Sequence, residues 1–263
     1  MNILDKIVAD KLLEVELKKK VVPVSQLENS ALFKREVLSL SEKIKKSSTG
    51  IIAEFKRRSP SKSIINQDLN IQEVARGYEK AGVCGMSVLT DGKYFGGSLD
   101  DLLIARAAVN IPILRKEFII DEYQILEAKS YGADAILLIA SVLSKDELKN
   151  FANFAKNLGL DVLLEIHNEA ELEKSVNVAA DLMGVNNRNL KTFEVSIENS
   201  KKLAQKIPAN FVKVSESGIS NPAVINELKK HDFKGFLIGE NFMRTSQPGE
   251  SASNFIRQIQ NSN

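Results

Sequence analysis

Residues Ala135–Ala140 read AILLIA, a continuous apolar run followed by a polar stretch with helical spacing. A run of this kind, without polar alternation, is typical of a strand buried on both faces of a parallel sheet. In the stretch that follows, residues 144–158, Ser144 and Glu147 predict a capping box at the start of a helix, and Gly159 predicts its end. The segment is therefore expected to form one strand-plus-helix unit.

Runs of the same kind occur eight times along the 263 residues. They are Ile51–Ala53, Met86–Leu89, Ile111–Leu114, Ala135–Ala140, Val162–Ile166, Leu182–Val185, Phe211–Val214 and Phe236–Ile238. Eight such units in a chain of this length are typical of a (β/α)₈ barrel. An open doubly wound sheet would more often carry a Gly-rich dinucleotide fingerprint after its first strand, whereas Lys56–Pro60 reads KRRSP. We therefore predict an α/β protein built on a single (β/α)₈ TIM barrel.

Amphipathic stretches lie between the runs and predict the outer helices. They are Ile71–Ala81, Asp121–Tyr131, Ser144–Leu158 and Pro222–Lys230. Ahead of the first run, Ile3–Leu17 and Ala31–Ile44 also have helical spacing. We interpret residues 1–48 as an N-terminal helical extension packed on a barrel of residues 49–263, so that residues 1–263 form one domain.

The composition limits the function classes. A net charge of +2 argues against a nucleic-acid partner, because such proteins usually carry a strongly basic face. Cys84 is the single cysteine, and His167 and His231 are the only histidines, so neither an internal disulfide nor a Cys/His metal site is expected. The sequence has no apolar run of 18 residues and no signal-peptide core, so we expect no membrane partner and a cytoplasmic location.

Ionisable side chains recur where the apolar runs end. Glu54 and Lys56 follow the first run, Lys116 follows the third, and Glu165 lies near the end of the fifth. In a (β/α)₈ barrel the active site lies at these strand ends, and the two-residue period of a strand puts Glu54 and Lys56 on one face. Charges gathered there must pair or bind a ligand, and their shifted pKa values suit acid–base chemistry. The alternative is a set of surface salt bridges.

Two glycine turns follow the last two runs, Ser217-Gly218 and Gly239-Glu240. Small residues in these turns let backbone N–H groups approach an anion, as in the usual phosphate site of a barrel. Ordinary tight turns are the alternative. Phe95 lies in a Gly-rich loop after the second run, where it could either cover an aromatic or apolar substrate group or pack on its own barrel.

Taken together, these motifs resemble the indole-3-glycerol-phosphate synthase family. The most specific is Ile51–Lys62, which reads IIAEFKRRSPSK. The others are Phe95–Ser98 (FGGS), Ile113–Ile119 (ILRKEFI), Gly184–Leu190 (GVNNRNL), Ser215–Ile219 (SESGI) and Leu237–Glu240 (LIGE). They occur in order from the first run to the last, and the N-terminal extension also suits the family, so the resemblance covers nearly the whole chain.

The resemblance implies a carboxy-lyase of tryptophan biosynthesis. Its substrate is a small sugar phosphate, 1-(2-carboxyphenylamino)-1-deoxy-D-ribulose 5-phosphate. Ring closure followed by loss of CO₂ and water gives indole-3-glycerol phosphate. No cofactor is expected, because the iminium formed on ring closure accepts the electrons released with CO₂. We also expect a monomer and, since the sequence ends at Asn263, no fused second pathway enzyme.

The resemblance also implies roles for individual residues. Lys116 would be the general acid, and Glu165 would be the base for dehydration. Lys56 would bind the substrate carboxylate and donate a proton in a later step. Glu54 would hold and tune the lysines, and Asn186 would orient the substrate's oxygens. The expected phosphate ligands are Ser59, Ser217, Gly218, Gly239 and Glu240, of which Ser217 is also counted as catalytic. The expected contacts to the rest of the substrate are Ser59, Pro60, Phe95, Phe118, Leu137, Arg188, Leu190 and Glu216.

Two positions depart from the family pattern. Ser63 stands where Gly is common, and Glu117 stands where Asp is common. Neither departure removes a group from the chemistry. Two other functions stay open: an isomerase barrel for a related phosphoribosyl compound, and a non-catalytic barrel that senses a sugar phosphate. The first has no evident use for Lys56, Lys116 and Glu165 together, and the second would tolerate their loss.

Overall fold

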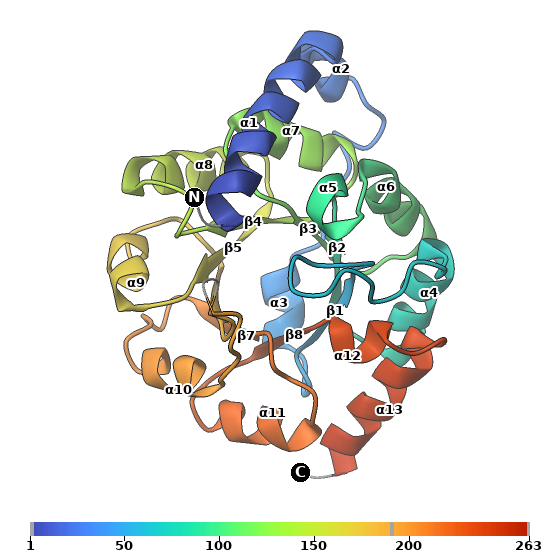
Figure 1. The fold of residues 1–263 in the computed structure, drawn as a ribbon, viewed down its shortest axis with the longest axis vertical. Coiled ribbons are helices and arrows are strands. Elements are labelled where there is room, and N and C mark those ends of the chain that lie inside the picture. Colours follow the sequence, from blue (N-terminus) through green and yellow to red (C-terminus); the bar gives the residue numbers. More distant parts are fainter. Residues whose placement is uncertain (1–2, 190–191, 262–263) are drawn as a thin grey trace.

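The computed structural model describes residues 3–189 and 192–261, and within these ranges eight parallel strands close into a barrel (Figure 1). The strands are β1 Ile51–Phe55, β2 Gly85–Leu89, β3 Ile113–Lys116, β4 Ala135–Ile139, β5 Asp161–Ile166, β6 Leu182–Asn186, β7 Val212–Glu216 and β8 Gly235–Ile238. Each strand pairs with the next in the sequence, and β8 pairs with β1. The predicted (β/α)₈ barrel is confirmed, and each predicted apolar run overlaps one strand.

Strand β1 shows how the sequence brings a charged residue into the barrel. Ile51, Ala53 and Phe55 are buried in the layer between the strands and the outer helices. Ile52 belongs instead to the cluster that fills the barrel interior. Because side chains alternate between the two faces of a strand, Glu54 shares the inward face with Ile52.

Helices surround the barrel and lie between successive strands (Figure 1). They are α4 Ile71–Ala81, α6 Leu99–Ala108, α7 Glu122–Ser130, α8 Lys145–Asn157, α9 Glu169–Ser175, α10 Glu198–Ala204, α11 Pro222–Lys229 and α13 Pro248–Asn261, with the short α5 Gly92–Phe95 and α12 Glu240–Met243 in the loops after β2 and β8. The predicted capping box of Ser144 and Glu147 is present at the start of α8. Asn221 caps α11, with Pro222 in its first turn.

The N-terminal segment contains α1 Ile3–Val21, α2 Val24–Glu28 and α3 Leu40–Lys45. The prediction of one helix over Ala31–Ile44 is wrong, because the helix begins only at Leu40. Upstream of it, the Asp134 carboxylate accepts hydrogen bonds from the Leu38 N–H at 2.8 Å and from the Arg35 guanidinium at 2.6 Å. These bonds hold the chain in a non-helical path toward β4.

Helix α3 closes the end of the barrel where the strands begin. Leu40 and Ile44 pack in the interior cluster together with Cys84, which is buried as predicted. A Cβ atom at Gly85 would lie 2.5 Å from the Leu40 side chain, so glycine is needed for this close approach. With this end filled, the barrel is open to substrates at the opposite end, where the strands finish. None of the described helices has both the length and the apolar character needed to cross a membrane.

Candidate active site

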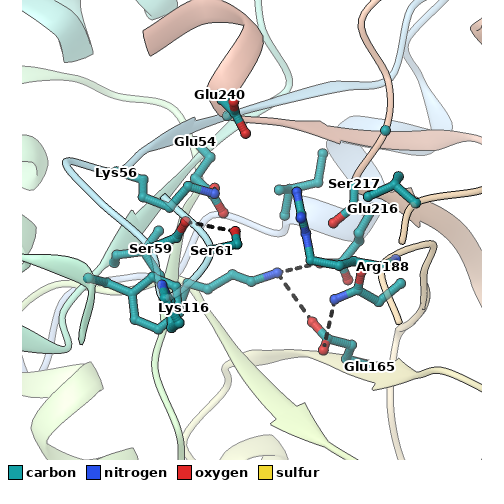
Figure 2. Close-up of a pocket in the computed structure, with 18 of the residues that line it drawn as sticks. Glu54, Lys56, Ser59, Ser61, Lys116, Glu165, Arg188, Glu216, Ser217 and Glu240 are labelled. Atoms are coloured by element: carbon teal, nitrogen blue, oxygen red, sulfur yellow. Dashed lines mark hydrogen bonds and ion pairs between the residues drawn. The ribbon is translucent and has the colours of Figure 1, made fainter. Parts of the chain in front are cut away.

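A cavity of about 340 Å³ opens at the C-terminal ends of the strands (Figure 2). Every predicted site residue that the structure describes lines it: Glu54, Lys56, Ser59, Pro60, Phe95, Lys116, Phe118, Leu137, Glu165, Asn186, Arg188, Glu216, Ser217, Gly218, Gly239 and Glu240. Leu190, the remaining predicted residue, lies outside the described residues. The fold thus brings together side chains from positions 54 to 240.

Glu54 and Lys56 form an ion pair at the end of β1. Glu54 Oε1 lies 2.6 Å from Lys56 Nζ. The Glu54 side chain is buried and packs against the glycine turn after β8, where a Cβ atom at Gly239 would lie only 2.4 Å from Glu54 Oε1. Glycine at position 239 therefore lets the backbone of the proposed phosphate turn lie directly beside this ion pair.

Lys116, at the end of β3, extends across the cavity toward two carboxylates (Figure 2). Its Nζ donates a hydrogen bond to Glu165 Oε2 at 3.4 Å and a second to Glu216 Oε2. Burial opposes the charged ammonium, but the charges of Glu216, Glu165 and Glu54 outweigh it and raise the pKa of Lys116. These four side chains come from β1, β3, β5 and β7, as expected for one layer of a barrel interior. The layer holds an ammonium proton donor at the floor of the cavity.

The pKa of Glu216 is raised by its surroundings. Burial and the nearby negative charges of Glu165 and Glu54 together raise its pKa to about 7, although the positive charge of Lys116 opposes this shift. Glu216 Oε2 bonds to Lys116, whereas Oε1 is buried without a hydrogen-bond partner among the described residues. The sequence had indicated Glu216 only as a substrate contact. The structure also makes it the nearest partner of Lys116.

The pKa of Glu165 is shifted in the opposite direction, to below its ordinary value. Although burial opposes ionisation, the positive charge of Lys116, with His167 and a hydrogen bond from Asn186, lowers the pKa of Glu165. Asn186 Nδ2 donates to Glu165 Oε1 at 3.2 Å, and Asn186 Oδ1 accepts the Arg188 N–H at 3.0 Å. The amide is thereby fixed with its NH₂ toward the carboxylate. An ionised Glu165 beside a charged Lys116 is suited to act as a base next to an acid.

The turns after β7 and β8 form one side of the cavity. Ser217 and Gly218 both have left-handed backbone conformations, with φ of 69° and 77°. A Cβ atom at Gly218 would lie 2.5 Å from Val195 Cγ1, so the turn requires glycine there. The Glu240 carboxylate is paired with Lys62 at 3.0 Å and with Arg244. These cations offset the negative charge of Glu240, so this carboxylate does not prevent the backbone N–H groups of the turn after β8 from binding an anion.

The other side of the cavity is apolar. The rings of Phe95 and Phe118 lie with their centroids 6.0 Å apart at an interplanar angle of 40°. Pro60 and Leu137 also line the cavity. Of the two readings left open for Phe95, the structure therefore favours an aromatic facing the cavity. A flat aromatic group of a ligand would fit against this side while its anionic end reaches the glycine turns.

Sequence reasoning missed the contribution of the N-terminal helix. Ile3, Leu4 and Ile7 of α1 line the cavity, although the extension was expected only to pack on the barrel. The helical spacing of these apolar residues was visible, but spacing alone does not say which surface a helix covers.

A buried lysine anchors α1 to the site. Lys11 Nζ lies 3.0 Å from Asp91 Oδ2 and 3.1 Å from Glu117 Oε1, and it also pairs with Glu14. Glu117 directly follows Lys116 and accepts a hydrogen bond from the Thr90 hydroxyl at 2.8 Å. Glu117 is therefore part of the contact between the extension and the loop that carries the candidate acid.

The model of the family described as indole-3-glycerol phosphate synthase matches residues 4–258. The chain belongs to the indole-3-glycerol phosphate synthase family. It is 49% identical over 259 residues to the "Indole-3-glycerol phosphate synthase" of Bacteroides thetaiotaomicron, a match that covers 98% of this chain and 99% of that relative. The protein of the same name from Campylobacter fetus is 46% identical, over 92% of this chain and 94% of that relative.

Solved structures of lower identity share the fold of this family member. KGPDC from Streptococcus mutans superposes with a TM-score of 0.62 at 12% identity, covering 81% of this chain and 97% of that one. Thiamine phosphate pyrophosphorylase from Pyrococcus furiosus gives a TM-score of 0.61 at 13% identity, covering 85% and 98%. At these identities the likeness concerns the fold alone.

Proposed function

We propose that this chain converts 1-(2-carboxyphenylamino)-1-deoxy-D-ribulose 5-phosphate into indole-3-glycerol phosphate, CO₂ and water. The observation that carries the proposal is the position of Lys116, whose ammonium lies between the buried carboxylates of Glu165 and Glu216 at the floor of the cavity. The cavity also has an apolar side for the anthranilate ring and glycine turns for the phosphate. Membership of the family supports the same reaction.

The first step is ring closure. The ring carbon that bears the carboxylate attacks the ribulose carbonyl carbon, and the carbonyl oxygen takes a proton from the Lys116 ammonium to become a hydroxyl. The Lys56 ammonium binds the substrate carboxylate, and Glu54, 2.6 Å from it, holds the lysine in place. Positioned acids of this kind typically contribute about 10²–10⁴-fold to a rate.

The second and third steps remove CO₂ and water. The electron pair of the bond to the carboxylate neutralises the iminium as CO₂ leaves, so the substrate supplies its own electron sink. The hydroxyl group then takes a proton from the Lys56 ammonium, which CO₂ loss has freed from the substrate carboxylate, and leaves as water, while Glu165 removes the proton from the carbon that joins the ring nitrogen. Asn186, which donates to Glu165 Oε1, orients the carboxylate and the substrate oxygens.

The phosphate end would be held by backbone N–H groups of Ser217, Gly218, Gly239 and Glu240, together with the Ser59 hydroxyl. The left-handed turn at residues 217 and 218 supports this assignment, as does the pairing of the Glu240 carboxylate with cations. Phe95, Phe118, Pro60 and Leu137 would contact the anthranilate ring, with Arg188 at the mouth of the cavity.

We also propose that the enzyme acts as a monomer in the cytoplasm. One chain supplies residues for the acid–base cluster, the phosphate end and the aromatic side, so the site needs no second copy to be complete. Light scattering coupled to size exclusion tests this, and a dimer as the sole species in solution would contradict it.

The experiment that tests the proposed function supplies purified protein with the carboxyphenylamino-ribulose phosphate and follows indole fluorescence. We expect fluorescence to rise together with CO₂ release. Folded protein that yields neither would refute the proposal. An isomerase would consume its own phosphoribosyl substrate instead, and a sensor would bind the compound without consuming it.

A further inference from the structure

We propose that His167 is a positioning residue that keeps the Glu165 carboxylate ionised through the last step of the reaction, with Glu171 holding the imidazole in place. The inference rests on the proposed function, in which Glu165 removes a proton during dehydration. His167 does not line the cavity. It acts on the chemistry through its contact with Glu165.

The imidazole of His167 lies directly behind the carboxylate. Its Nε2 is 3.3 Å from Glu165 Oε1, and its Nδ1 is 3.2 Å from Glu171 Oε2. The side chain is 11% exposed, and Nε2 is buried without a directed hydrogen bond to any of the described residues. An imidazole placed between two carboxylates in this way is suited to carry a positive charge.

The surroundings fix the imidazole in this position. Glu171 Oε2 accepts the backbone N–H of His167 at 2.8 Å as well as contacting its ring, and Glu171 Oε1 accepts from Asn168 Nδ2 at 2.8 Å. On the other side, Asn199 Nδ2 donates to the carbonyl oxygens of His167 and Asn186, each at 3.0 Å. Both backbone and ring are thus held by neighbours from α9 and α10.

The titratable groups that act most strongly on the His167 ring are acidic. They are Glu165 near the end of β5, Glu171 on α9 and Glu216 on β7. Burial alone would lower the pKa of His167, but the hydrogen bond to Glu171 and these charges raise it. A neutral imidazole donating from Nδ1 to Glu171 would turn the Nε2 lone pair toward a carboxylate oxygen, which is repulsive.

The need for a second cation follows from the reaction order. In the resting site Lys116 is the main cation beside Glu165, at 3.4 Å. Lys116 gives up its proton during ring closure and becomes a neutral amine. Glu165, which is buried, would then tend to take up a proton and cease to be a base. The imidazolium of His167 is the cation that remains in contact with it at that stage.

The test compares wild type with His167→Gln and Glu171→Gln, measuring kcat and KM from about pH 5.5 to about pH 8.5, a range that brackets the acidic limb of a general base. His231→Gln is the matched control, because it removes the other histidine. Removing the imidazolium raises the pKa of Glu165, so the acidic limb of kcat moves to higher pH. If the pKa of Glu165 rises by one unit, kcat falls about tenfold at the acidic end of the pH range and hardly changes at the alkaline end. KM should stay constant, and Glu171→Gln should give a smaller shift in the same direction.

The inference is overturned if His167→Gln and His231→Gln share the wild-type pH profile, or if His167→Gln loses the same factor at every pH, as a packing defect would. Glu171→Gln covers the case in which His167→Gln fails to fold, because glutamine keeps an oxygen that accepts the backbone N–H. Glu165→Gln distinguishes a failure of the proposed function, in which Glu165 is the base, from a failure of the proposed role of His167. If that variant is fully active while wild type turns over, the assigned base is wrong and the role of His167 falls with it. If it is inactive and His167→Gln behaves as wild type, only the present inference fails.

Discussion

Lys116 Nζ lies 3.4 Å from Glu165 Oε2, although the two residues are 49 positions apart in the chain. They meet because β3 and β5 are both odd-numbered strands whose inward side chains share one layer of the barrel. Glu54 and Glu216 complete this layer from β1 and β7. A proposed acid and a proposed base are thus in contact before any substrate arrives. Each favours the charged form of the other, because Glu165 raises the pKa of Lys116 and Lys116 lowers the pKa of Glu165.

Glu165→Gln should slow the reaction without loss of substrate binding. Glutamine keeps the size and the oxygen that accepts from Asn186, but it cannot remove a proton. We expect kcat to fall by about 10²-fold or more, the scale typical of a lost general base. Stopped-flow or steady-state fluorescence measures this, with Glu122→Gln, an exposed residue at the start of α7, as the control. A decrease of less than about twofold is far below that scale and would remove Glu165 from the base role.

Glu216 should make stability depend on pH. Its pKa is about 7 in the folded protein, against an ordinary value of 4.5, so the folded state binds this proton more tightly than the unfolded chain does. The resulting stabilisation is present below the unfolded pKa and is lost as pH rises through 7. Relative to Glu216→Gln, wild type should lose on the order of 3 kcal/mol of unfolding free energy between acidic and slightly alkaline pH. Urea titrations check this, and a pH-independent difference between the two proteins contradicts it.

The conformation of Gly218 should matter for the phosphate. Alanine there adopts a left-handed conformation with difficulty, which costs about 1–2 kcal/mol, and its Cβ would meet Val195. We expect Gly218→Ala to raise KM and to weaken binding of inorganic phosphate in calorimetry. Gly82→Ala is the matched control, since Gly82 has φ of 81° with open space around its Cβ position. A KM equal to that of wild type in both variants would contradict the phosphate-binding role of Gly218.

Lys11 should be needed for the N-terminal helix to stay attached. Lys11→Met leaves the buried carboxylates of Asp91 and Glu117 without their cation, and breaking such a buried pair typically costs about 3–5 kcal/mol. We expect a lower melting temperature and a raised KM, because α1 also lines the cavity. The exposed pair of Lys93 and Asp10 connects α1 to the same side of the barrel, so Lys93→Met should leave both quantities nearly unchanged. Equal effects from the two substitutions would contradict the anchoring role.

The barrel could be predicted from the sequence because buried parallel strands leave continuous apolar runs, and the runs from Ile51 to Ile238 each overlap a strand. The charged strand ends could be predicted for the same reason, since Glu54, Lys116 and Glu165 interrupt or follow these runs at inward positions. Strand alternation decides which face a residue takes, so these side chains had to converge.

What could not be predicted depends on contacts between distant segments. Residues 31–39 have helical spacing, but the carboxylate of Asp134 on the barrel takes the hydrogen bonds that hold them in another path. The partnership of Glu216 with Lys116 and that of Lys11 with Glu117 require the barrel to be closed. Likewise, His167 had no apparent role until its ring was seen behind Glu165.

The most direct test of the account is turnover by Lys116→Ala, measured beside wild type and beside Lys149→Ala on the exposed face of α8. Alanine cannot protonate the carbonyl oxygen, while the glycine turns that would hold the phosphate are untouched. We predict that wild type and Lys149→Ala form indole-3-glycerol phosphate from the carboxyphenylamino-ribulose phosphate. Lys116→Ala should form none, although it still binds a phosphate ligand. Product formation by folded Lys116→Ala at a rate near that of wild type would contradict the central claim.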